Sequence, residues 1–125
     1  MKYTKIYGEV DCAPLGYENT TATVWVNLTA EVRDRHFRSF REMLDTSSTD
    51  AQREQAERDY EDTVAEFIKE VRSGDEIITI DGRDDLYKLR GEHDGQFIAY
   101  IVGCTFVLYN DRLAKAKATF RGSLS

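Results

Sequence analysis

The chain has 125 residues, which is enough for one hydrophobic core and too few for two, so we expect a single domain over residues 1–125. The net charge of −6 argues against direct nucleic-acid binding, because proteins that bind nucleic acids gather Lys and Arg on one face. Two cysteines, no signal peptide and no apolar run long enough to span a membrane favour a cytoplasmic protein.

The N-terminal part of the chain is predicted to form two strands. Residues 3–10 are rich in strand-forming side chains. Residues 12–20 contain Gly16 and the only proline, Pro14, and are expected to form a loop. Residues 21–28 alternate as a strand does, with Trp25 on the opposite face from Val24 and Val26.

Two amphipathic helices are predicted next. The first extends from about Ala30 to Asp45, and its apolar stripe is formed by Val32, His36, Phe37, Phe40, Met43 and Leu44. Residues 46–50 form a polar break that offers capping side chains. The second helix is predicted over Ala51–Arg72, where apolar residues recur at helical spacing before Ser73-Gly74. The short connection predicts an antiparallel helical hairpin.

The C-terminal half is predicted to consist of strands. Residues 76–80 and 86–90 form the first two, with turns at Asp81-Gly82 and at residues 91–95. Residues 96–109 are apolar on both faces, as a central strand is, and Gly103 indicates a bulge there. Residues 112–120 alternate between apolar and polar side chains, which favours a last strand, although their Ala and Lys content also allows a helix.

This order of elements predicts an α+β fold rather than a doubly wound parallel sheet. We expect one antiparallel sheet of five to six strands, in the order ββααββββ, with the last strand possible as a helix. The two-helix hairpin is expected to cover one face of the sheet. The other face would then expose aromatic side chains, among which Trp25 and Tyr100 are candidates for contact with a partner.

Few side chains are candidates for catalysis. The sequence has no phosphate-binding glycine loop, serine elbow or paired-cysteine motif, so we predict no cofactor and no metal site. Cys12 in its loop, His36 and His93 are the candidates for a small cysteine- and histidine-dependent hydrolase or transferase. His36 is expected at the edge of the core and His93 in a solvated turn, and Cys104 is expected to be inert packing.

The leading hypothesis is a non-enzymatic protein-interaction module. The second predicted helix carries an acidic face that would suit a partner with a basic surface, and its candidate contact residues are Glu54, Glu61, Asp62, Glu66 and Glu70. The alternative is a structural subunit of a larger assembly, and self-association would fit either hypothesis.

One local resemblance adds to this expectation. Val24-Trp25-Val26-Asn27 runs directly into an amphipathic helix, and from Tyr17 to about Asp45 this arrangement resembles small bacteriophage accessory proteins such as tail-assembly chaperones. Leu28 stands where the proline of that pattern is expected after Asn27. The resemblance implies a small accessory or inhibitor protein, or a phage tail component.

Overall fold

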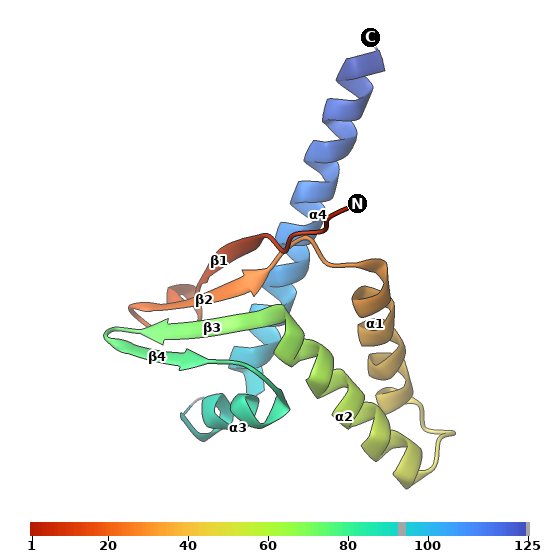
Figure 1. Ribbon diagram of the computed structural model, residues 1–125. Coiled ribbons are helices and arrows are strands. Elements are labelled where there is room, and N and C mark those ends of the chain that lie inside the picture. Colours follow the sequence, from red (N-terminus) through yellow and green to blue (C-terminus); the bar gives the residue numbers. More distant parts are fainter. Residues whose placement is uncertain (93–94, 125) are drawn as a thin grey trace.

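The computed structural model describes residues 1–92 and 95–124. Within these residues the chain forms a four-stranded antiparallel sheet, four α-helices and one 3-10 helix, which confirms the α+β class (Figure 1). Along the chain the elements are β1 (Tyr7–Asp11), η1 (Ala13–Leu15), β2 (Thr20–Trp25), α1 (Ala30–Leu44), α2 (Asp50–Phe67), β3 (Ile68–Ser73), β4 (Glu76–Thr79), α3 (Arg83–Glu92) and α4 (Gly95–Leu124).

The sheet has the strand order β1-β2-β3-β4, and each strand pairs antiparallel with the next. Val10 pairs with Ala22, Ala22 with Val71 and Val71 with Ile78, so these side chains form one apolar row across the sheet. The first half of α4 packs on this face (Figure 1). The sheet was predicted to have five to six strands with a helical hairpin on one face. The number of strands is wrong, because the sheet has four. The place of the hairpin is also wrong, because α4 covers the face of the sheet and the hairpin lies beyond one end of it (Figure 1).

The hairpin of α1 and α2 forms where local signals predicted it. The Thr29 side chain caps α1 by accepting a hydrogen bond from the backbone of Val32. Thr49 and Gln52 form a capping box at the start of α2, because each side chain accepts from the backbone of the other residue. These caps satisfy backbone N–H groups that the helices themselves leave without partners.

The predicted second helix was too long at its C-terminal end. Helix α2 ends at Phe67, and residues 68–73 are strand β3. Ile68 and Val71 are three residues apart, which is a helical spacing, yet both are buried on one face of β3. A register shift in the pairing of β2 and β3 places an extra residue, Lys69, between them. Because of this bulge, Ile68 and Val71 lie on the same face of the strand although they are three residues apart.

The strands predicted at residues 86–90 and 96–109 are wrong, and of the two alternatives for residues 112–120 the helix is the one that forms. Residues 86–90 lie in α3, and the other two segments lie in the long helix α4. The buried positions of α4 follow helical periodicity, with Phe97 and Ile98, then Ile101 and Val102, then Thr105. Its exposed side carries small or apolar side chains such as Ala99, Gly103 and Val107, so the segment resembled a strand buried on both faces.

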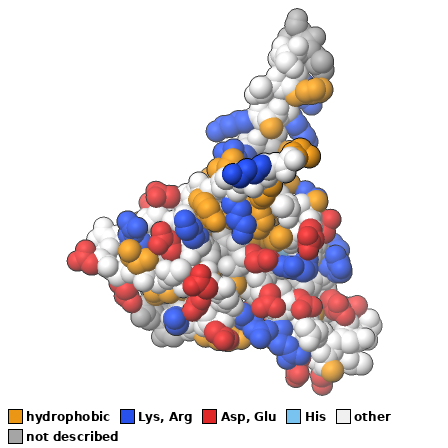
Figure 2. All heavy atoms as spheres, viewed as in Figure 1, with side chains coloured by type: hydrophobic (Ala, Val, Ile, Leu, Met, Phe, Trp, Pro, Cys, Tyr) orange, Lys and Arg blue, Asp and Glu red, His pale blue; other side chains and the backbone are white. Residues whose placement is uncertain are grey.

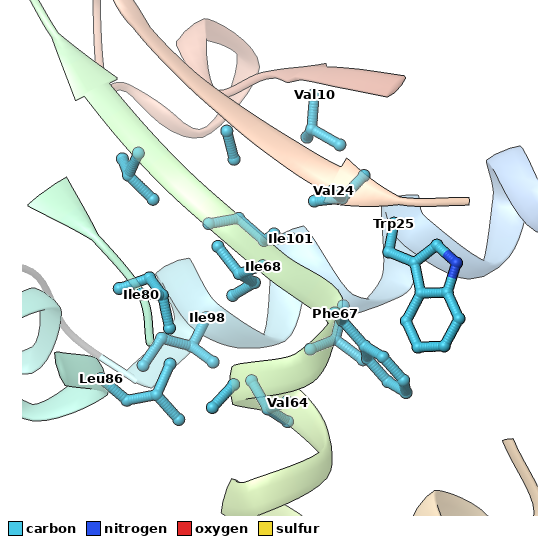
Figure 3. Packing of buried hydrophobic residues seen from close by; sticks show 14 of the residues in the cluster. Val10, Val24, Trp25, Val64, Phe67, Ile68, Ile80, Leu86, Ile98 and Ile101 are labelled. Atoms are coloured by element: carbon cyan, nitrogen blue, oxygen red, sulfur yellow. The ribbon is translucent and has the colours of Figure 1, made fainter. Parts of the chain in front are cut away.

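The core lies between the sheet, α3, α4 and the end of α2. Figure 3 shows Ile101 of α4 beside Ile68 of β3, with Leu86 of α3 and Phe67 of α2 closing the cluster. All four side chains are fully buried. Burial of each contributes about 1.5–3 kcal/mol to folding.

Of the helices in the described part of the chain, none combines the length and hydropathy needed to cross a membrane.

Candidate functional site

His36 is buried in α1 and is surrounded by aromatic rings. The hydroxyl of Thr63 donates to the backbone carbonyl of Tyr60 at 2.7 Å, so it accepts from Nδ1 of His36 at 2.9 Å. Burial lowers the pKa of His36 from its ordinary value of 6.5 to about 4, so the ring is neutral at pH 7. Such a histidine packs and donates a hydrogen bond. The neighbouring rings are those of Phe37, Tyr60, Phe67 and Phe106.

Cys12 is fully buried at the end of β1. Its thiol lies 3.7 Å from the carbonyl oxygen of Val10, and burial raises its pKa to about 11. The nucleophilic thiolate is therefore scarce at neutral pH. Cys104 is half-buried in α4, and His93 lies outside the described residues. No contact found among the described residues joins Cys12 to His36.

The five acidic residues predicted to contact a partner do not form one open face. Glu54, Asp62 and Glu66 are exposed on α2. Glu66 forms an ion pair with Arg35 of α1, and Asp62 lies 4.0 Å from Arg83 of α3. Glu70 is half-buried in β3 rather than on a helix, with Arg72 at 3.8 Å.

Glu61 differs from the other four because it is buried between α2 and α3. Its Oε2 atom lies 3.5 Å from Nη1 of Arg90 and is the one described buried side-chain oxygen or nitrogen without a hydrogen bond. Hydrogen bonding to the Glu61 carboxylate raises the pKa of the Tyr87 hydroxyl above its ordinary value. Glu61 therefore connects two helices rather than facing solvent.

The two aromatic residues predicted on an open sheet face lie elsewhere. Trp25 is buried, and its indole N–H donates to the Tyr3 hydroxyl at 2.9 Å and to Oδ1 of Asn27 at 2.8 Å. The half-buried Tyr100 belongs to α4, and its hydroxyl donates to the backbone carbonyl of Asp11 at 3.0 Å. Both side chains hold the N-terminal strand region to the rest of the fold.

A hollow of about 680 Å³ lies between α2, the start of α3 and the sheet. Its lining contains charges of both signs that neutralise one another, as in the pairs Arg35–Glu66 and Arg83–Asp62. Its two lysines lie over aromatic rings, Lys5 over Trp25 and Lys69 over Tyr7. The hollow therefore presents no converging charge of one sign. Nor does the described part of the chain contain three His, Cys, Asp or Glu side chains grouped to hold a metal ion.

One exposed apolar helix surface lies at the C-terminal end of α4, a segment that we name the α4 extension (residues 110–124). Residues 110–123 are all exposed, and the helix projects from the body of the protein (Figure 1). Figure 2 shows basic and apolar side chains along this projection. Leu113 and Phe120 are 41% and 64% exposed. With Ala116 they form the α4 stripe, which continues the packed positions Val102, Phe106 and Tyr109 at spacings of three and four.

A second exposed stripe lies on α1. Phe37 and Phe40 are each 40% exposed and Leu44 is 63% exposed, and we name these three residues the α1 stripe. Sequence reasoning placed them on one buried stripe with Val32 and His36. The burial of Val32 and His36 is confirmed, and Ser39 is buried with them, whereas these three side chains are exposed. Beside the stripe, Met43 helps to line a hollow of about 330 Å³ whose other lining residues belong to α2: Asp50, Arg53, Glu54 and Glu57.

Sequence reasoning missed both stripes as surfaces. The spacing of apolar residues from Val102 to Phe120 was a usable signal, because alternating steps of three and four are helical.

No protein-family model, curated protein or solved structure matches the chain.

Proposed function

We propose that this protein is a non-enzymatic protein-interaction module that acts through exposed helix surfaces. The observation that carries the proposal is the α4 extension, an exposed amphipathic helix with Leu113 and Phe120 in solvent. An apolar stripe of this kind gains free energy when another apolar surface covers it, at roughly 25 cal/mol for each Å² removed from water.

The surroundings of Cys12 and His36 favour this proposal over a hydrolase or transferase. That alternative requires a reactive thiol and a basic imidazole, and burial works against both. The exposed acidic residues Glu54, Asp62 and Glu66 remain proposed contacts for a basic partner surface. A structural subunit of a larger assembly is the second candidate, and the projecting helix favours it because such a helix can reach a neighbouring molecule.

Capture experiments with extract from the native host separate binding from catalysis. We expect immobilised wild-type protein to retain specific proteins, and a Leu113→Asp/Phe120→Asp variant to lose them. Both substitutions lie on exposed positions, so the fold should be kept. A matched control is Val107→Asp, which changes an α4 residue that is 60% exposed and lies outside the α4 stripe. Two results would contradict the proposal. The first is that the double variant still captures the same proteins. The second is that an activity of the protein in its host is lost in the Cys12→Ala variant.

A further inference from the structure

We infer that the α4 extension of one molecule binds the α1 stripe and the neighbouring acidic residues of α2 on a second copy of this chain. The inference rests on the proposed function and names the partner. Three observations carry it: the division of charge between the extension and the body, the matching spacing of two apolar stripes, and the direction in which the extension points.

Charge is divided unevenly along the chain. The α4 extension contains four basic residues, Arg112, Lys115, Lys117 and Arg121, and one acidic residue, Asp111. Residues 1–109 contain 13 Lys and Arg against 22 Asp and Glu. Helix α2 is the most acidic described helix, with seven acidic and two basic residues. The basic partner surface that suits this acidic helix is thus present in the chain itself.

The two exposed stripes have the same spacing. Phe37, Phe40 and Leu44 occupy positions i, i+3 and i+7 of α1, and the residues of the α4 stripe occupy positions i, i+3 and i+7 of α4. Each stripe spans about 10 Å at 1.5 Å per residue, so the two match in length. Within its own molecule Phe37 contacts Phe106 and Phe40 contacts Tyr60, and the exposed parts of both rings together with Leu44 are what a docked helix would cover.

Acidic residues lie where the flanks of a docked extension would reach. Glu54 and Glu57 line the hollow beside Met43 and are exposed. Asp50 in the same hollow is paired with Arg53 at 2.5 Å, whereas no ion pair of Glu54 or Glu57 is found among the described residues. The two free carboxylates complement the lysines and arginines that flank the α4 stripe.

The same charges disfavour pairing of two extensions with each other. In a parallel coiled coil built on the α4 stripe, Arg112 and Lys117 are five residues apart and flank the apolar seam on opposite sides. These are the positions that face each other across such a pair, so two extensions would bring like charges together. An extension also cannot reach the α1 stripe of its own chain, because α4 is continuous and carries it away from α1 and α2 (Figure 1).

Sedimentation of the purified full-length protein over a wide range of concentrations tests this inference. We expect the wild type to self-associate, and Phe120→Asp and Leu44→Asp each to weaken association by at least about tenfold. Both positions are more than 60% exposed, and Val107→Asp, at 60% exposure on the same helix, is the control that should associate as the wild type does. High salt should weaken the association of the wild type.

Mixing the two variants gives the sharpest result. The Leu44→Asp protein keeps an intact extension, and the Phe120→Asp protein keeps an intact α1 stripe, so the mixture should regain one contact and form heterodimers. Pairing between extensions would not be restored in this way. A mass of one chain at every concentration, or association that persists in both variants, would overturn the inference. Capture of another protein through the extension would still support the proposed function.

Discussion

At the scale of single residues, the buried polar groups of this protein serve the fold. His36 donates to Thr63, and Thr63 in turn donates to the carbonyl of Tyr60, so one hydrogen-bonded chain joins α1 to α2. Asn27 makes a comparable connection near the N-terminus. Its side chain accepts from the backbone N–H of Ile6 at 2.7 Å and donates to the carbonyl of Thr4 at 2.9 Å. The buried groups of the His36–Thr63 pair are the ones that would be costly to leave without partners.

The low pKa of His36 predicts a specific loss of stability in acid. Because the folded pKa of about 4 lies below the ordinary value of 6.5, the unfolded chain binds a proton more readily than the folded protein. The contribution of His36 to stability is therefore complete above pH 6.5 and declines as the pH falls toward 4, by at most about 3 kcal/mol.

Urea unfolding of the wild type and of His36→Gln at both ends of this pH range measures the effect. Glutamine cannot titrate, and its amide can still donate to Thr63, so the variant should lose less stability on acidification. The carboxylates titrate in both proteins and cancel in the comparison. An equal loss in the two proteins would show that His36 is not the group responsible.

At the scale of elements, the sequence predicted those whose signals are local. Helix α1 was predicted from about Ala30 to Asp45 and extends over Ala30–Leu44, because its cap and apolar period belong to the helix itself. The end of α2 and the start of β3 depend on pairing with β2, residues 20–25, and on the bulge at Lys69. No local pattern contains that information.

Helix α4 was mistaken for strands for a different reason. Its exposed face is apolar, and the alternation of residues 112–120 satisfies a strand pattern by chance. The bulge predicted at Gly103 is wrong, because Gly103 is an interior residue of a helix with open space where a side chain would point. Of the predicted contact residues, Glu54, Asp62 and Glu66 are exposed on α2, and the remaining four lie at buried or half-buried positions. Glu61 is covered by α3, a segment predicted to be a strand, and Glu70 lies in β3 beyond the true end of α2.

Substitution of Gly103 tests the helical assignment directly. We expect Gly103→Ala to raise the free energy of unfolding by about 0.5–1 kcal/mol, because alanine favours helix over glycine and meets no neighbouring atom here. Gly103→Val should be less stable than Gly103→Ala, because β-branched residues lose side-chain freedom in helices. In a strand this order would be reversed, so denaturant unfolding of the two variants decides between helix and strand.

At the scale of the whole molecule, α4 has two roles along its length. Its first half forms part of the core through Phe97 and Ile101, and residues 110–123 of its second half add no buried side chain. The body can therefore fold without the extension, whereas an exposed helix end that lacks tertiary packing is only weakly stable in water. The extension is thus the part of the protein whose order depends most on a partner.

Hydrogen exchange and a truncated chain test this division of roles. A chain that ends at Asn110 should unfold with a free energy within about 0.5 kcal/mol of the full-length protein, because the side chains of residues 111–123 are exposed. In the dilute full-length protein, amides of residues 113–123 should exchange much faster than those of residues 97–105. Concentration should slow exchange in the extension and in the solvent-facing part of α1 together, because each covers the other in the associated form. If amides at both sites still exchange fast in the concentrated protein, the extension does not mediate self-association. If truncation causes a large loss of stability, the extension belongs to the core.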